Sequence, residues 1–247
     1  MAEGRLPGRV AIVTGAGTGM GRAIALALAE EGARVVLAGR SADRLAETAS
    51  ALEAIGARAI VRPTDVTDPG QCHALAQAAL DGWGQIDLLV NNAGTNTRRR
   101  GYADATLDDW SAVVRTNLDG VYFCTQAVLP TMRAQGRGQI INISSLAGRR
   151  ASVVSGVAYS ASKHGVVALT QSLNEEEWRN GIRASCVEPG ETATPILELR
   201  PSVPPPESWA DMLQAEDIAE AVRYLATLPD RVLVDELSIR PRVRRLG

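Results

Sequence analysis

Short β-branched runs alternate along this chain with longer amphipathic segments, and no other feature of the sequence constrains its fold as strongly. The apolar runs predict strands at 10–13, 34–37, 59–61, 86–90, 139–143, 182–187 and near 236–239. Helical patterns lie between them at about 20–31, 42–55, 69–82, 107–134, 158–178 and 216–228. Strands that are apolar on both faces and separated by helices are typical of a parallel sheet covered on both sides. We therefore predict an α/β fold with a doubly wound parallel sheet of about seven strands flanked by helices.

The composition indicates an ordinary globular chain. Its 247 residues are 45% hydrophobic, which is enough for a sizeable core, and no linker or internal repeat divides them. We expect a single domain over residues 1–247. The formal net charge is only −2, with acidic and basic residues interspersed, and aromatic residues make up only 4%. Nucleic acid is therefore not an expected partner.

The sequence also bears on the cellular environment. The longest apolar runs, such as 23–29 and 86–90, are far too short to span a membrane, and the first residues lack a secretory apolar segment. We expect a cytoplasmic protein with no membrane partner. The three cysteines, Cys72, Cys124 and Cys186, lack the paired spacing of a zinc site. We interpret them as buried thiols and expect no metal.

A proline-rich segment interrupts the pattern late in the chain. Between Thr194 and Trp209 the sequence contains five prolines, so this segment can form neither a central strand nor a long helix. One interpretation is a mobile flap that covers the site and extends over about 194–212. The other interpretation is a plain surface loop.

A glycine-rich turn directly follows the first strand and precedes a helix. Its pattern, T-G-x-x-x-G-x-G, runs from Thr14 to Gly21. Glycines allow the backbone to approach a pyrophosphate closely, and the helix that follows presents unpaired N–H groups to the charge. We therefore predict a dinucleotide-binding turn in a Rossmann fold rather than a purely structural one. Its predicted contacts are Gly15, Gly17, Thr18, Gly19, Met20 and Gly21.

Tyr159 and Lys163 are four positions apart and share one face of the helix predicted at 158–178. An ammonium about 4 Å from a phenol contributes about 4 kcal/mol at an effective dielectric of about 20, which is worth up to roughly three pKa units. The pair therefore predicts a lowered pKa for Tyr159 and proton exchange near neutral pH. The alternative is two solvated residues on a helix.

Five motifs follow one another in a fixed order. They are Thr14 to Gly21, Asn91-Asn92-Ala93-Gly94, Ser144-Ser145-Leu146-Ala147-Gly148, Tyr159-x-x-x-Lys163 and Pro189-Gly190-Glu191-Thr192-Ala193-Thr194. Over roughly residues 8 to 195 the chain closely resembles the short-chain dehydrogenase/reductase family. The resemblance is to the branch of 3-oxoacyl-carrier-protein reductases and alcohol and steroid dehydrogenases.

The resemblance implies a catalytic set. Tyr159 would supply a proton to a carbonyl, Ser145 would hydrogen-bond the carbonyl oxygen, and Lys163 would lower the tyrosine pKa and hold the nicotinamide ribose. Asn117 matches the position that maintains a proton relay to that lysine, its alternative being a helix-surface amide. The predicted activity is therefore interconversion of a ketone or aldehyde with an alcohol by hydride transfer.

The resemblance also implies further cofactor contacts. Asn91, Ala93 and Gly94 match the segment that closes the cofactor site after the fourth strand. Asp65 and Val66 match the adenine contact, although a turn aspartate ahead of the helix that begins at Asp68 is an alternative for Asp65. The residues that match the turn carrying the carboxamide are Pro189, Gly190, Thr192 and Thr194.

The end of the second strand favours NADP over NAD. A carboxylate there would bind the ribose 2′-OH and repel a 2′-phosphate, but the chain has Arg40 and Ser41 instead. A guanidinium and a hydroxyl at the start of a helix suit a phosphate. The alternative is that Arg40 only lies along the helix surface.

Several features depart from the family or are left without a role. Glu188 stands where the family usually has a small or amide residue, and a basic segment from Arg240 to Arg245 replaces the usual glycine-rich ending. The runs Arg98–Arg100 and Arg149–Arg150 follow the fourth and fifth strands. They could bind an anionic substrate, but the sequence favours solvated loops.

Two other functions compete with the oxidoreductase. A catalytically silent dinucleotide sensor would have no need for Asn117, Ser145, Tyr159 and Lys163 together. A sugar-nucleotide epimerase would need a larger C-terminal domain. The resemblance further implies a homo-oligomer, a tetramer or dimer built on the long helices near 107–134 and 158–178.

Overall fold

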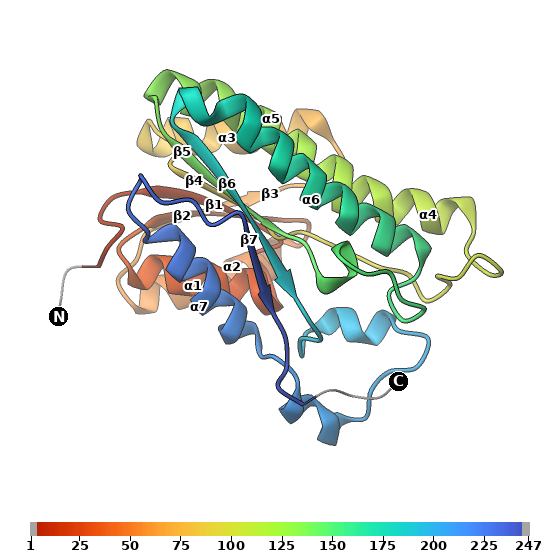
Figure 1. Cartoon of the computed structure of the whole chain (residues 1–247). Coiled ribbons are helices and arrows are strands. Elements are labelled where there is room, and N and C mark those ends of the chain that lie inside the picture. Colours follow the sequence, from red (N-terminus) through yellow and green to blue (C-terminus); the bar gives the residue numbers. More distant parts are fainter. Residues whose placement is uncertain (1–3, 244–247) are drawn as a thin grey trace.

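The computed structural model describes residues 4–243 as a single domain with a central sheet between two layers of helices (Figure 1). The seven strands are all parallel in the order β3-β2-β1-β4-β5-β6-β7. They are β1 (Val10–Thr14), β2 (Arg34–Gly39), β3 (Ala59–Pro63), β4 (Leu88–Asn91), β5 (Gly138–Ile143), β6 (Ile182–Pro189) and β7 (Glu236–Ile239). The predicted doubly wound sheet is confirmed.

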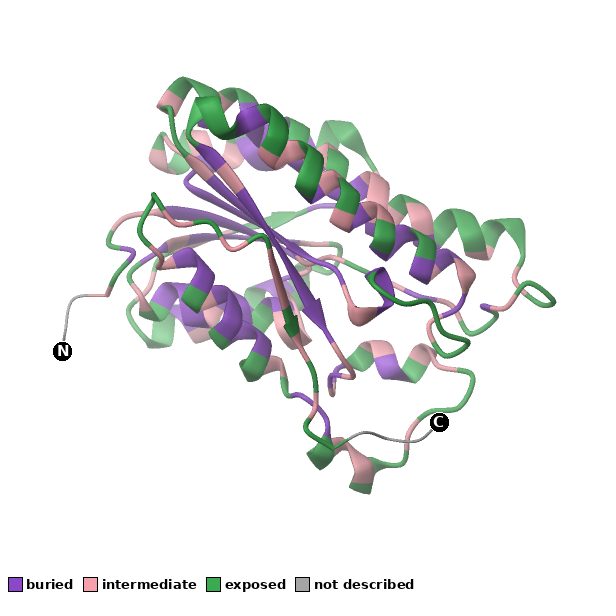
Figure 2. Cartoon of the chain, in the orientation of Figure 1, coloured by how far each residue is buried: buried purple, intermediate pink, exposed green. Residues whose placement is uncertain are grey.

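Helices cover both faces of the sheet (Figure 1). They are α1 (Gly19–Glu30), α2 (Ala42–Ala54), α3 (Pro69–Trp83), α4 (Leu107–Val114), α5 (Gly120–Gln135), α6 (Val157–Glu177) and α7 (Ala215–Ala226). Helices α1, α2 and α7 pack on one face, and α3, α5 and α6 on the other. The five central strands β2, β1, β4, β5 and β6 are largely buried between these layers, as the purple ribbons of Figure 2 show, whereas the edge strands β3 and β7 are only partly covered.

The first strand shows why its sequence is apolar throughout. Successive side chains of a strand point to opposite faces of the sheet. Accordingly Ala11 and Val13 join the cluster under α1 and α7, while Val10 and Ile12 join the cluster under α3 and α5. All four are at most 1% exposed. A strand covered on both faces therefore needs apolar residues at both its odd and its even positions.

The helix predicted at 107–134 is interrupted. A π-helical turn, Arg115–Asp119, separates α4 from α5 without breaking the helical path. The fully buried Asn117 lies in this turn. A π turn widens the helix locally and is common at functional sites. The hydrophobic period of the sequence does not reveal such an insertion.

Polar side chains tie the carboxyl ends of the strands together. Asn92 Nδ2 donates to the Thr14 carbonyl at 2.9 Å, which joins β4 to β1. Asn91 Nδ2 donates to Asn142 Oδ1 at 2.9 Å, which joins β4 to β5. Asn142 Nδ2 in turn donates to Thr170 Oγ1 on α6 at 2.9 Å. The edge at which parallel α/β sheets bind ligands is thus held by buried hydrogen bonds.

The proline-rich segment contains two 3₁₀ helices, Pro195–Leu199 and Pro206–Asp211. This confirms that the segment forms neither a central strand nor a long helix. Leu197 is 3% exposed, so the first of these helices is anchored in the domain. A flap motion of the segment stays a prediction.

The structure tests two of the expectations drawn from composition, those on the cysteines and on membrane-spanning helices. Cys72, Cys124 and Cys186 are buried free thiols, as predicted. Among the helices of residues 4–243, none combines the length and apolar character that crossing a membrane requires. The end of the basic segment, Arg244 and Arg245, lies outside the described residues, as do residues 1–3.

Candidate active site

A cavity of about 450 Å³ opens at the carboxyl edge of the sheet. The glycine turn, the end of β2, the loops after β3 and β4, helix α6 and the segment after Thr194 all contribute to its walls. The predicted cofactor residues on these walls are Gly15, Gly17, Thr18, Gly19, Met20, Gly21, Arg40, Ser41, Asp65, Val66, Ala93, Gly94, Tyr159, Lys163 and Thr194. Ser144 also lines the cavity, so residues from all five motifs meet around one space.

The glycine turn forms the cavity wall at the start of α1. Gly15 and Gly19 have φ angles of +66° and +50°, a region that side chains disfavour. A Cβ atom on Gly21 would stand 2.1 Å from the Gly15 carbonyl oxygen. The turn is therefore compact because it lacks side chains, and the first N–H groups of α1 are the kind that bind phosphate.

Basic groups lie where β2 ends. Arg40 and Ser41 line the cavity, and Ser41 caps α2 by accepting a 3.4 Å hydrogen bond from Arg44 N. Arg44 lines the cavity too, although the sequence analysis did not select it. Arg44 lies in the first turn of α2, directly after the β2 end that was predicted to bind the cofactor. That position is the sequence signal that could have identified Arg44. Two arginine residues therefore line this wall of the cavity.

Asp65 takes part in a turn and also lines the cavity. Its Oδ1 accepts hydrogen bonds from both Thr67 N and Thr67 Oγ1 at 2.9 Å, while Asp68 caps α3. The turn interpretation is therefore confirmed. Contact with an adenine stays a prediction.

Lys163 is buried, with 4% of its surface exposed. Its Nζ donates a 2.7 Å hydrogen bond to the Ile143 carbonyl at the end of β5 and lies 5.6 Å from the centroid of the Tyr159 ring. Burial lowers the pKa of Lys163 from 10.5 to about 8. The side chain therefore joins α6 to the sheet edge and presents a titratable group to the cavity.

The predicted lowering of the Tyr159 pKa is wrong for this structure. Burial raises the pKa of the phenol above its ordinary value of 10, and a hydrogen bond with Ser145 and the charges of Arg100 and Arg200 offset this only in part. The spacing along the helix places an ammonium beside the phenol, but the cost of desolvating the phenolate inside the fold outweighs such a charge. Lys163 instead directs its ammonium at a backbone carbonyl.

Asn117 is fully buried, so the alternative of a helix-surface amide is wrong. Its Oδ1 accepts from Thr95 N at 2.8 Å, and its Nδ2 donates to the Thr95 carbonyl at 2.9 Å and to Ser162 Oγ at 3.3 Å. The π turn therefore holds the loop after β4 against α6. No sequence pattern indicated these partners, because they lie 22 and 45 positions away.

The two serines after β5 have different surroundings. Ser145 Oγ accepts from Ala147 N at 3.1 Å and donates to the Pro189 carbonyl at 3.4 Å. Ser144 Oγ is buried and donates to the Lys163 carbonyl at 2.9 Å, which fixes α6 to β5. Ser144 lines the cavity, whereas Ser145, the predicted catalytic serine, is the one that hydrogen-bonds to the Tyr159 phenol.

The structure places four predicted cofactor residues behind the cavity wall. Asn91 bonds to Asn142 inside the sheet edge, and Gly190 N donates to the Ile239 carbonyl at 2.7 Å. The other two are Pro189, the last residue of β6, and Thr192, whose hydroxyl donates to the Gly190 carbonyl at 3.2 Å. These residues shape the backbone that supports the cavity. Asn92, which bonds to Thr14, lines it instead of Asn91.

Glu188 is fully buried rather than exposed. Arg149 forms ion pairs with Glu188 and Glu236, and Ser238 donates a hydrogen bond to Glu188. Arg149 is therefore part of an ion-pair network, although its side chain remains 49% exposed, as expected for a solvated loop. This network links the loop after β5 to β6 and β7.

The comparisons with known proteins agree with this geometry. The family model for short chain dehydrogenases matches residues 9–202. An uncharacterized oxidoreductase of Staphylococcus aureus strain N315 is 37% identical over 236 residues, which cover 96% of this chain and 98% of that protein. The chain therefore belongs to the short-chain dehydrogenase family, and it is an oxidoreductase of that family.

Two solved structures are similar over nearly the whole chain. A metagenomic short-chain oxidoreductase in complex with NADP is 36% identical with a TM-score of 0.83, and the match covers 97% of this chain and 100% of that one. Actinorhodin polyketide ketoreductase with NADPH is 35% identical with a TM-score of 0.86, covering 94% and 95%.

Lys163 is the only lysine in the sequence, so its titration can be followed without assignment. We predict that protein labelled with ¹³C at lysine Cε gives one lysine signal with a midpoint at about pH 8, well below 10.5. The side chain is then an ammonium below this pH and a neutral amine above it. In urea the same signal should titrate near its ordinary value. A native midpoint at or above about 10 would contradict the assigned burial of the charge.

Proposed function

We propose that this chain is an NADP-dependent oxidoreductase that interconverts a ketone or aldehyde with an alcohol by hydride transfer. The observation that carries the proposal is that Tyr159 and Lys163 line the same cavity as the glycine turn. A dinucleotide that lies along this cavity from the end of β2 would bring its reactive end to the Tyr159 phenol. Membership in the short-chain dehydrogenase family supports the reaction class. The positions of the glycine turn and Tyr159 in one cavity support the orientation in which the cofactor would lie.

The residues of the cavity fit NADP. The turn from Gly15 to Gly21 offers the close backbone approach that a pyrophosphate needs. Arg40 and Arg44 offer two guanidinium groups to a 2′-phosphate, and the hydroxyl of Ser41 lies between them in sequence. NADP and NADPH in the two similar structures support the same choice. When bound, NADPH would supply the hydride that reduces the carbonyl carbon.

The chain's own groups would handle the proton. Tyr159 would donate its phenolic proton to the carbonyl oxygen, and the Ser145 hydroxyl, its hydrogen-bond partner, would orient that oxygen. Lys163, held at the Ile143 carbonyl, would bind the ribose hydroxyls and stabilise the phenolate that forms. Asn117 would hold the π turn and the Thr95 loop in place for a relay of protons to Lys163.

The other predicted contacts have supporting parts in this proposal. Ala93, Gly94, Asp65 and Val66 would enclose the adenosine and ribose, because they line the cavity. Thr194 would close the cavity at the nicotinamide end, where the flap segment begins. Behind that wall, Asn91, Pro189, Gly190 and Thr192 would act by fixing the backbone rather than by direct side-chain contact.

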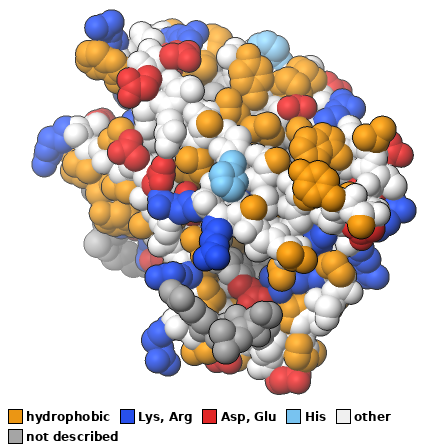
Figure 3. Space-filling model, turned by 45° about the vertical axis from the view of Figure 1, so that its right-hand side comes forward, with side chains coloured by type: hydrophobic (Ala, Val, Ile, Leu, Met, Phe, Trp, Pro, Cys, Tyr) orange, Lys and Arg blue, Asp and Glu red, His pale blue; other side chains and the backbone are white. Residues whose placement is uncertain are grey.

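We also propose a homo-oligomer, a dimer or tetramer, built on α4, α5 and α6. Apolar side chains are exposed on or just after these helices, with Trp110 at 44%, Tyr122 at 49% and Trp178 at 62%. Figure 3 shows orange side chains on one face of the molecule, with uncharged and some charged side chains between them. Such patches are typical of protein interfaces.

Sedimentation equilibrium should give a mass of two or four times 26.1 kDa, because the proposed assembly is a dimer or a tetramer. A mass of one chain would contradict this proposal.

Tyr159→Phe should lower kcat by roughly 10²- to 10⁴-fold, because it removes the proton donor and keeps the ring. NADPH binding, followed by cofactor fluorescence, should stay close to that of the wild type. Lys163→Ala should impair both turnover and binding, since it removes a ribose contact as well as a charge. If the phenylalanine variant keeps wild-type turnover, the assigned role of Tyr159 is wrong.

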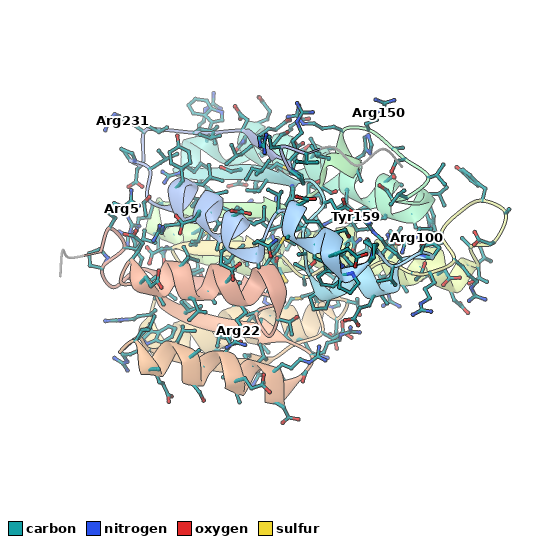
Figure 4. The ribbon with its side chains drawn as sticks, turned by 90° about the horizontal axis from the view of Figure 1, so that it is seen from below. Arg5, Arg22, Arg100, Arg150, Tyr159 and Arg231 are labelled. Carbon is teal, nitrogen blue, oxygen red and sulfur yellow. The ribbon has the colours of Figure 1, made fainter. Side chains whose placement is uncertain are left out.

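Replacement of both Arg40 and Arg44 by Gln should lower kcat/KM for NADPH by roughly 10- to 100-fold, the worth of one or two charge-assisted hydrogen bonds. The value for NADH should change little. Arg22→Gln is the matched control, because Arg22 is an exposed arginine on α1 (Figure 4) and is not among the residues that line the cavity. A wild-type preference for NADH would defeat the assignment of NADP.

A further inference from the structure

Arg100 is a buried arginine at which three loops meet. It is 7% exposed, and its Nε donates to the Thr97 carbonyl at 2.8 Å. Its Nη1 donates to the Val154 carbonyl at 2.7 Å and its Nη2 to the Leu199 carbonyl at 2.5 Å. These carbonyls belong to the loops after β4, β5 and β6. The sequence interpretation of a solvated loop is therefore wrong for Arg100.

Arg100 forms no ion pair with a carboxylate of the described residues, whereas the neighbouring Arg99 pairs with Asp109 at 3.0 Å. Of the acidic side chains that the structure describes, only Asp104 acts on the charge of Arg100 from farther away. The three acceptors of Arg100 are neutral carbonyls, and a guanidinium has five N–H donors. Burial and the positive charge of Arg200 lower the pKa of Arg100, and Tyr159 and Asp104 offset this only in part. A buried cation of this kind gains most from a nearby anion.

Arg100 lies directly behind the wall at the Tyr159 end of the cavity rather than on its lining. Leu199, whose carbonyl it binds, lines the cavity together with Tyr159. The Arg100 carbonyl also accepts a 2.9 Å hydrogen bond from Val157 N, the first residue of the helix that carries Tyr159. Figure 4 labels Arg100 and Tyr159 on the same side of the molecule, next to the segment that follows Thr194.

A second guanidinium acts at the same place. Arg200 directly follows Leu199, and its side chain is 20% exposed and pairs with Glu191 at 2.5 Å. The positive charges of Arg100 and Arg200 both lower the pKa of the Tyr159 phenol, although burial outweighs them. The two guanidinium groups therefore act from one region on the atom that would donate a proton to the substrate.

We propose that Arg100 and Arg200 bind a carboxylate on the substrate, so that the enzyme acts on oxo acids and the matching hydroxy acids. The proposal rests on the function proposed above and adds the substrate class. A carboxylate accepts the planar donor pairs of guanidinium groups, and it would supply the negative charge that Arg100 lacks, whereas Arg200 already pairs with Glu191. It would also orient the carbonyl group toward Tyr159. The carboxylate is bound and left unchanged, while the carbonyl carbon gains a hydride and its oxygen gains a proton.

The test compares a charged substrate with its neutral counterpart. The probes are 4-oxopentanoate and 2-oxobutanoate, each measured beside its methyl ester with NADPH. For at least one pair, the wild type should prefer the acid by about tenfold or more in kcat/KM, mainly through KM. Arg200→Met should lower this acid-to-ester ratio by about tenfold, and Arg200→Lys, which keeps the charge, should retain most of it.

Controls separate charge recognition from loop structure. Arg150→Met removes an exposed arginine from the loop after β5 and should leave the ratio unchanged. Arg100→Met should lower the ratio as well, and its melting temperature and NADPH affinity show whether the three loops survive. If the wild type favours the esters, or if both methionine variants fold and keep the wild-type ratio, the two arginines only organise loops and the proposal is overturned.

Binding distinguishes this inference from the proposed function. Calorimetric titration of each acid and ester into protein saturated with NADP⁺ measures carboxylate recognition without turnover. Tight binding of the acid that Arg200→Met weakens, in a protein that reduces no carbonyl, would support the anion site and contradict the proposed reaction. Equal affinity for acid and ester, in a protein that does reduce them, would contradict the anion site alone.

Discussion

The ammonium of Lys163 is buried at the end of β5, where its Nζ donates a 2.7 Å hydrogen bond to the Ile143 carbonyl. A buried charge is costly, so the surrounding structure has to hold it firmly. Ser144 binds the Lys163 carbonyl, and Asn117 reaches Ser162 on the neighbouring turn of α6. The position of Tyr159 along α6, and with it the end of the cavity, follows from these contacts.

Most of the architecture could be predicted from sequence because parallel strands leave a simple pattern. A strand such as Val10–Thr14 is apolar throughout because helices cover both of its faces. The glycine turn and the Tyr159–Lys163 pair are local in sequence, so their spacing predicted their place on the cavity wall. Motifs formed by residues close together in the sequence therefore predict where those residues lie in the fold.

The remaining features depend on contacts between distant residues. Asn117 binds Thr95 and Ser162, and the π turn that allows this has no signature in the hydrophobic period. The raised pKa of Tyr159 follows from burial, which spacing along a helix does not give. The burial of Glu188 depends on Arg149, 39 positions earlier in the chain. Such pairings become visible only in three dimensions.

Arginine groups lie near both ends of the cavity. Arg40 at the end of β2 and Arg44 in the first turn of α2 line the cavity, and Arg100 and Arg200 act on Tyr159 from behind the wall at the other end. The chain is close to neutral overall, with a formal net charge of −2, so this arrangement is local rather than a property of composition. Positive charge near both ends suits an anionic cofactor at one end and an anionic substrate at the other.

Direct transfer of hydrogen between cofactor and substrate tests the central claim. NADPH carrying deuterium at C4 of the nicotinamide is incubated with a carbonyl substrate in ordinary water, and the alcohol is examined by mass spectrometry. The account predicts one deuterium on the carbinol carbon when the transferred position is labelled, and none when the opposite face is labelled. An alcohol whose carbinol hydrogen comes from solvent with either label would contradict hydride transfer in this cavity.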